Sequence, residues 1–249
     1  AYEIRACLVG SEMCIRDRNI SMKGFRPNGY LIVQIYKVGA PSIVVQAIGS
    51  LMTYGMNLIL AAFGSAQTVF GIYFKLQSFV FMPVFGLNNG MVPIIAYNYG
   101  AGHKDRVIKT IKHSVAYGVG IMFAGLLAMH IFPAQLMRMF DAEESLIAIG
   151  APALETISLS FVFAGFCIVA GSVFQALGNG VYSMIVSVAR QMCVLLPVAK
   201  LLSLSGEVTL IWWAFPIAEL ASVLLTSYFL VRIYRKVICH IGEPVVQDA

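Results

Sequence analysis

Four ionisable residues interrupt stretches of the chain that are otherwise apolar, namely Lys75, Glu155, Arg190 and Glu219. At a rise of 1.5 Å per helical residue, each lies about 13 to 17 Å from one end of its stretch. Charges in such surroundings are costly, so they usually face a protein interior and pair with one another, and they are candidates for binding ions or moving protons. By depth we expect Lys75 to pair with Glu155, and Arg190 to pair with Glu219. The alternative is a static brace between helices.

A second group of polar residues shares one face of an earlier apolar stretch. Ser42, Gln46, Ser50, Thr53 and Asn57 are spaced by four, four, three and four residues, which is the repeat of a helix. Because amides are costly to bury without partners, we expect Gln46, Ser50 and Asn57 to line a water-filled cavity. The alternative is hydrogen bonding to a neighbouring helix, which explains the Ser and Thr residues well.

Prolines and glycines punctuate the long apolar stretch 66–106, where Pro83, Gly86, Gly90 and Pro93 follow one another closely. A proline inside a helix removes a backbone hydrogen bond, and in membrane proteins other groups can satisfy the freed carbonyl. We predict a broken helix here, because broken helices at membrane depth often carry substrate or ion sites. A simple packing kink is the alternative.

Composition assigns these stretches to a membrane protein. Hydrophobic residues make up 59% of the 249 residues and charged residues only 12%, and the mean hydropathy is +0.82. This leaves too little polar surface to cover a soluble domain of that length. A membrane-spanning helix takes about 20 residues. We therefore expect an all-α polytopic membrane protein, whose six spans lie at 38–63, 67–98, 109–132, 147–174, 180–203 and 208–233.

The two ends of the chain differ from this apolar region. Residues 5–18 resemble the translated read-through of a sequencing adapter, so we expect residues 1–18 to be a non-native extension. We assign 19–34 to a polar, basic linker, 35–236 to the six-helix lobe and 237–249 to a tail.

Basic residues concentrate on one side of this predicted topology. If the first span starts in the cytoplasm, that side collects Lys23, Arg26, Lys37, Lys104, Arg106, Lys109, Lys112, Arg232, Arg235 and Lys236. The other side receives only Arg138 and Lys200, together with most of the acidic loop residues. Since basic loops stay in the cytoplasm, we expect both termini there and the protein in the inner (plasma) membrane of the cell. The formal charge of +5 is then topological, and no nucleic-acid partner is implied.

Residues suited to other chemistries are scattered. The five cysteines have neither paired nor metal-ligand spacing, and the four histidines lie near predicted helix ends. The sequence lacks H-E-x-x-H, G-x-S-x-G and the phosphate-binding G-x-x-x-x-G-K-[ST]. We therefore expect neither an enzyme nor a bound metal or cofactor, and any transport would draw on an ion gradient or on another subunit.

Three segments of the chain carry a family pattern. They are 39–42 (GAPS), 82–102 (MPVFGLNNGMVPIIAYNYGAG) and 174–179 (FQALGN), the last followed by Ser187, Arg190, Gln191 and Pro197. Together they resemble the C-terminal half of multidrug and toxic compound extrusion (MATE) transporters, over residues 35–236. The resemblance implies a twelve-helix antiporter with two six-helix lobes around a central cavity. This chain resembles the second lobe, and the missing N-terminal lobe is its implied partner.

The same resemblance bears on the coupling ion and the substrate. Sodium-coupled members carry acids deep in the first and fourth helices of this lobe, whereas here the first helix has Gln46 and Ser50 and the fourth has Glu155. The resemblance thus leaves H⁺ or Na⁺ open as the coupling ion. It implies a small, lipophilic and often cationic substrate, held by the amides of Gln46, Asn57 and Asn88. The expected apolar walls are Tyr73, Phe74, Phe81, Met82 and Phe85.

Two alternatives stay open at this point. A lipid-linked oligosaccharide flippase of the same wider superfamily would have a similar helix count, although we would expect more basic residues in its spans than Lys75 and Arg190. A half-length chain could also be an inactive fragment.

Overall fold

The computed structural model describes residues 29–241, and the rest of the chain lies outside the described residues. The expected extension 1–18, most of the expected linker and the residues Cys7, Cys14, Lys23 and Arg26 fall there. Two compact units are distinguished, 1–37 and 38–249. Within the first, the described residues form the opening turns of a helix that starts at Gly29, inside the expected linker. The second unit carries everything discussed below.

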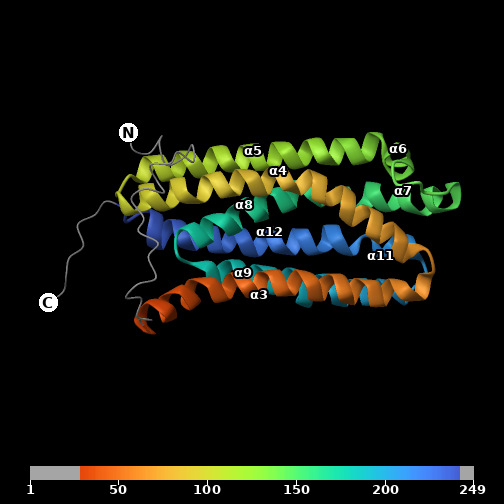
Figure 1. Cartoon of the computed structure of the whole chain (residues 1–249), viewed down its shortest axis with the longest axis horizontal. Helices are drawn as coiled ribbons and strands as arrows, with labels where there is room; N and C mark the ends of the chain where they lie inside the picture. Colours follow the sequence, from red (N-terminus) through yellow and green to blue (C-terminus); the bar gives the residue numbers. More distant parts are fainter. Residues whose placement is uncertain (1–28, 242–249) are drawn as a thin grey trace, which may run out of the picture. The chain divides into compact units, whose positions relative to one another are not determined.

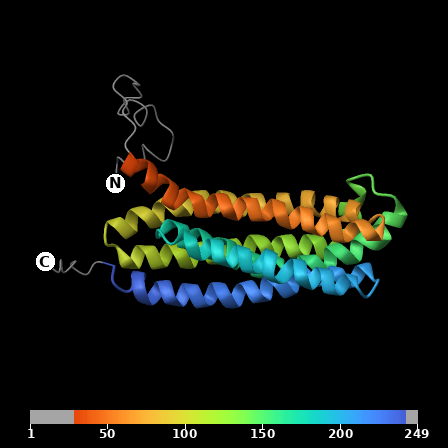
Figure 2. The same ribbon diagram turned by 90° about the horizontal axis from the view of Figure 1, so that it is seen from below.

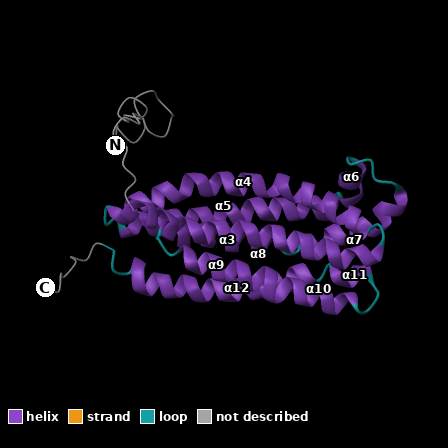
Figure 3. Cartoon of the chain, turned by 60° about the horizontal axis from the view of Figure 1, so that its bottom comes forward, coloured by secondary structure: helices purple, strands orange, loops and turns teal. Residues whose placement is uncertain are grey.

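The described residues are almost entirely helical (Figure 3). In chain order the elements are α3 (Gly29–Leu60), η1 (Ala61–Phe63), α4 (Ala66–Gly100), α5 (Lys104–Ile131), α6 (Pro133–Arg138), α7 (Glu144–Ser158), α8 (Phe161–Ala176), α9 (Gly180–Val188), η2 (Ala189–Leu195), α10 (Leu196–Ser203), α11 (Val208–Ile211), α12 (Ala214–Ile233) and η3 (Tyr234–Ile238).

The predicted all-α polytopic architecture is confirmed. In the described residues, five helical segments are long and apolar enough to cross a membrane, and α7 with α8 makes a sixth if that bent pair is one span. Their bounds lie within a few residues of the predicted spans, because hydropathy and length alone define such segments.

The predicted break in the second span is wrong, because α4 runs as one helix from Ala66 to Gly100 with Pro83 and Pro93 inside it. These prolines and the intervening Gly86 and Gly90 are spaced by three, four and three residues, and all four are exposed. The proline rings therefore lie on an outer face of α4. On that face a helix can bend without its inner hydrogen bonds being lost.

The helical ladder is interrupted at two other places. Between α7 and α8 the chain bends by 49°. Between α9 and α10 it forms the π-helix η2, which ends two residues before Pro197. Proline has no N–H to donate to the carbonyl four residues earlier, and a π-turn is one way to accommodate the changed register.

Within residues 38–241, α8 lies between the other spans. It packs against α5 and α4 and against α12 and α9. Figure 1 shows α8 between α4 and α12, and Figure 2 shows the same bundle turned by 90°. Helices α5 and α8 meet at Gly118 and Gly165, where a methyl group added to Gly165 would lie 3.1 Å from the Gly118 carbonyl oxygen. Small residues thus allow the close approach typical of membrane helices.

The connections gather at two opposite ends of this unit (Figure 1). The α4–α5 turn lies beside the end of the last helix, where Lys104 Nζ donates a hydrogen bond to the Cys239 carbonyl at 3.0 Å. That end holds the described basic residues Arg106, Lys109, Lys112, Arg232, Arg235 and Lys236. The opposite end holds the Arg138–Glu144 ion pair of 2.9 Å. The charge asymmetry predicted from the sequence is therefore present in three dimensions.

Candidate functional site

Arg190 and Glu219 form an ion pair in the interior of the second unit. Nη1 of Arg190 donates to Oε1 of Glu219 at 2.5 Å. The Glu219 side chain is only 10% exposed and that of Arg190 25% exposed. The second carboxylate oxygen, Oε2, is buried without a hydrogen-bond partner among the described residues. The predicted pairing of Arg190 with Glu219 is confirmed.

Two elements bring this pair together. Arg190 is the second residue of η2, so it lies on the irregular turn between α9 and α10. Glu219 lies on the inner face of α12, which packs against both η2 and α8. Because the hydrogen bonds of a π-turn span one more residue than those of an α-helix, η2 changes the direction in which Arg190 points.

Further buried polar groups line the same side of α12. Ser222 and Thr226 follow Glu219 by three and seven residues and are fully buried. Both hydroxyls donate to the Cys167 sulfur of α8, at 3.4 Å and 3.7 Å. We did not predict these residues, although their spacing from Glu219 places them on one helical face and is visible in the sequence.

The expected pair between Lys75 and Glu155 is not formed within the 4 Å limit of an ion pair. Lys75 is exposed on α4, and its Nζ lies 5.7 Å from the centre of the Phe140 ring. Glu155 is half-buried on α7. Lys75 and Glu155 were placed at equal depth, but α4 and α7 present these side chains in different directions. A long lysine side chain can also extend toward a membrane boundary.

The polar face predicted on the first span is divided by the structure. Gln46 and Ser50 are exposed on α3. Thr53 and Asn57 are half-buried, and each donates to a backbone carbonyl four residues earlier in the same helix, at 3.0 Å and 2.9 Å. Such local bonds satisfy side chains that would otherwise need a partner helix or water.

The residues expected to form apolar walls also separate into two groups. Tyr73, Phe74 and Phe81 pack into an aromatic cluster with rings from α8 and α12. Met82 and Phe85 are exposed on α4, at 72% and 52% of their surface. Asn88 is buried on α4, and its Oδ1 has no partner in the described part of the chain.

These features together define a class of protein. An ion pair enclosed among apolar spans and placed beside an irregular helix turn is typical of a membrane transporter. Over residues 29–241, no three His, Cys, Asp or Glu side chains gather as metal ligands would. In this arrangement the Arg190 guanidinium neutralises the charge of the Glu219 carboxylate.

The model of the MatE family matches residues 41–201, which is more than half of the chain, so the chain belongs to this family. The curated relatives include the multidrug export protein MepA of Staphylococcus haemolyticus (strain JCSC1435), 25% identical over 220 residues, or 88% of this chain and 48% of MepA. MepA of Staphylococcus aureus (strain N315) is 26% identical over 203 residues, or 81% of this chain and 44% of MepA.

Solved structures agree with this membership. The MATE multidrug transporter DinF-BH is 31% identical with a TM-score of 0.77, and the match covers 94% of this chain and 52% of DinF-BH. The Vibrio cholerae MATE transporter VcmN superposes with a TM-score of 0.83 at 15% identity, over 96% of this chain and 55% of VcmN, which shows a shared fold. The chain thus spans about half the length of these relatives.

Proposed function

We propose that this chain forms one six-helix lobe of a twelve-helix antiporter that exports drugs or other lipophilic, often cationic compounds against a gradient of H⁺ or Na⁺. Family membership supports the transport class, and the names of relatives such as MepA support drugs as substrates. The observation that carries the proposal is the enclosed Arg190–Glu219 pair beside η2.

Glu219 is our candidate for the exchange of the coupling ion. Its Oε1 is bound to Arg190, whereas its buried Oε2 has no partner in the residues described. If Arg190 moves away, an unpaired carboxylate in this apolar setting becomes costly. Binding a proton or a sodium ion relieves that cost. Ion binding at Glu219 would therefore favour the conformation in which Arg190 is released.

The substrate surface that we propose lies on the exposed sides of α3 and α4. Gln46 and Ser50 offer polar atoms there, and Met82 and Phe85 offer apolar area. Membrane lipid does not satisfy amides, so a second lobe and the wet cavity between the two lobes are the proposed neighbours of these residues. The N-terminal lobe is thus the proposed protein partner, and a small molecule the proposed ligand.

The proposed location is the inner membrane, with both termini in the cytoplasm. This orientation follows from the basic end of the lobe, where Lys104, Lys109 and Lys236 gather.

The test is drug resistance in a bacterial host that lacks its own drug pumps. The full transporter that this proposal requires, both lobes in one frame, is expressed unchanged, as Glu219→Gln and as Glu155→Gln. Gln keeps the size of the side chain and removes its charge. We expect Glu219→Gln to lower resistance to the level of the empty vector, and Glu155→Gln, at a carboxylate with no ion pair, to retain it.

Membrane levels of each variant, measured by immunoblot, separate loss of transport from loss of protein. Full resistance in Glu219→Gln would remove this residue from the coupling step. Absence of resistance from the unchanged transporter would argue against drug export itself.

A further inference from the structure

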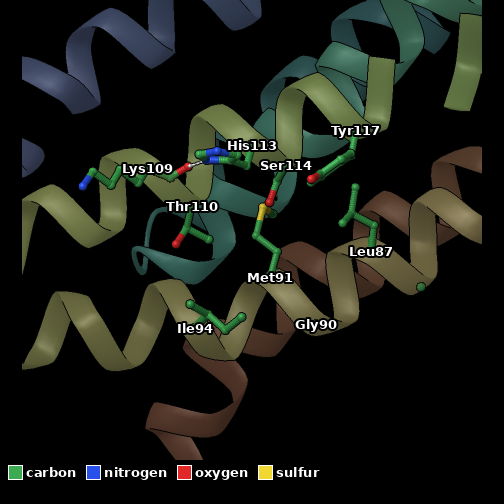
Figure 4. Close-up of a pocket in the computed structure, with 10 residues that line it drawn as sticks. Leu87, Gly90, Met91, Ile94, Lys109, Thr110, His113, Ser114 and Tyr117 are labelled. Atoms are coloured by element: carbon green, nitrogen blue, oxygen red, sulfur yellow. Dashed lines mark hydrogen bonds between the residues drawn. The ribbon is translucent and has the colours of Figure 1, made fainter. Parts of the chain in front are cut away.

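A groove of about 470 Å³ runs between α4 and α5 (Figure 4). On the α4 side it is lined by Gly86, Leu87, Gly90, Met91 and Ile94. On the α5 side it is lined by Lys109, Thr110, His113, Ser114 and Tyr117. None of these residues takes part in the ion pair discussed above.

The two glycines leave open space on the α4 side of this groove. A methyl group added at Gly86 or Gly90 would meet no other atom within 4 Å. Between α5 and α8, by contrast, the neighbouring helix occupies the space beside Gly118 and Gly165. No described residue therefore fills the space beside Gly86 and Gly90, and that space is large enough for a hydrocarbon chain.

The groove has a polar end and an apolar end. Lys109 extends away from Tyr117 in Figure 4, and its ammonium group makes no ion pair or hydrogen bond with the described residues. His113 is held in place because its Nδ1 donates to the Lys109 carbonyl at 2.7 Å. Met91 and Leu87 lie further along, toward Tyr117.

The distance along α5 between Lys109 and Tyr117 is comparable to the distance from a lipid head group into its acyl chains. Helix α5 begins at Lys104, so Lys109 lies about 7.5 Å from the helix start and Tyr117 about 12 Å deeper. Arg106 and Lys112 flank Lys109 on the same helix and are exposed. A positive charge thus lies at the head-group level, and an apolar channel continues into the hydrocarbon.

We propose that this groove binds one anionic glycerophospholipid, with its phosphate head group at Lys109 and one acyl chain along Gly86 and Gly90. The charge complementarity selects an anionic head group. The apolar, glycine-lined channel selects a chain-bearing lipid over a free phosphate ion. This site includes neither Arg190 nor Glu219, and its α4 side adjoins the proposed substrate surface, since Gly86 lies four residues from Met82 on the same exposed face.

Native mass spectrometry of the detergent-purified 249-residue chain measures the binding directly. The chain is titrated with phosphatidylglycerol and, separately, with phosphatidylcholine of the same acyl chains. We expect one tightly bound phosphatidylglycerol per chain and weaker binding of phosphatidylcholine. Added inorganic phosphate should not displace the lipid, because the acyl chain contributes to binding.

Two pairs of variants locate the site. Lys109→Gln should weaken phosphatidylglycerol binding by about fivefold, since one basic residue contributes modestly at a membrane surface. Lys112→Gln, at an exposed neighbour that does not line the groove, should leave it unchanged. Gly90→Leu should fill the channel and abolish binding of both lipids. Gly71→Leu, which also lies in open space on α4 but outside the groove, should leave the binding of both lipids unchanged.

Several results would overturn this proposal. They are equal binding of the two lipids, displacement by inorganic phosphate, or unchanged binding in Lys109→Gln and Gly90→Leu. The melting temperature of every variant is measured alongside, and Gly90→Leu must match Gly71→Leu for a loss of binding to count as support.

Discussion

At the level of single residues, the two pairs expected from the sequence had different outcomes. Arg190 and Glu219 form an enclosed ion pair, whereas Lys75 contacts an aromatic ring and Glu155 has no ion-pair partner in the described chain. Both pairs balance in charge and were placed at similar depth. The difference lies in the face of the helix on which each residue sits. Glu219 lies on the buried face of α12, whereas Lys75 lies on an exposed face of α4.

The enclosed Arg190–Glu219 pair leads to a prediction about stability. The variants that test it also distinguish a pair that only braces two helices from one that takes part in transport. Replacing Arg190 with Met leaves Glu219 buried without compensation and should lower the free energy of unfolding by about 3–5 kcal/mol. The double variant Arg190→Met with Glu219→Leu removes both charges and should recover most of this loss. Thermal unfolding of the purified chain in detergent, followed by circular dichroism, measures both changes.

If the double variant folds stably, its transport activity in the two-lobe frame becomes decisive. A stable but inactive double variant supports a role in transport, whereas a stable and active one reduces the pair to a brace. A single variant as stable as the unchanged chain would mean that Glu219 is not isolated from water.

At the level of elements, glycines determine which helices come close. Gly118 and Gly165 allow α5 and α8 to touch, and a methyl group at Gly118 would lie 2.7 Å from a side-chain carbon of Val169. In contrast, Gly71, Gly86 and Gly90 on α4 face open space. The same residue type thus has a packing role on α5 and α8 and leaves an open surface on α4.

This contrast predicts different tolerance to larger side chains. Gly165→Leu inserts carbon atoms against a backbone carbonyl that cannot move aside, and should destabilise the chain by about 1–3 kcal/mol or more. Gly71→Leu adds the same atoms where nothing is displaced, and should be neutral or slightly stabilising, because glycine is a poor helix former. The readouts are melting temperature and the monodisperse fraction in size-exclusion chromatography. Equal melting temperatures for the two variants would contradict the close α5–α8 contact.

At the level of the whole molecule, the arrangement of helix ends predicts membrane topology. The hydrogen bond between Lys104 and Cys239 places the α4–α5 turn and the end of the last helix on one side. Glu207 precedes α11 and lies in the connection at the opposite end. Single cysteines introduced by Lys104→Cys and Lys236→Cys should therefore react with an impermeant maleimide from the same side of sealed vesicles, and Glu207→Cys should react from the other.

The background for this labelling experiment has the five native cysteines replaced by serine or alanine, since Cys193 is exposed. Inside-out and right-side-out vesicles are compared, so that the assignment to the cytoplasm is tested as well. Labelling of the Lys104 and Lys236 variants from opposite sides would contradict the fold.

Hydropathy and charge were sufficient to predict the helical class, the approximate spans and the gathering of basic residues at one end. These signals are local or additive along the chain, so they do not depend on how the helices pack. The resemblance of 82–102 and 174–179 to MATE transporters identified the family, and the family model agrees.

The three-dimensional packing alone determined the continuity of α4, the π-turn at Arg190, the lack of an ion pair between Lys75 and Glu155, and the open groove beside Gly90. Each of these features depends on how a helix is rotated about its own axis and which neighbour it meets. Rotation is set by contacts between residues far apart in the sequence, such as Gly118 with Val169, and no periodicity within a single span records them.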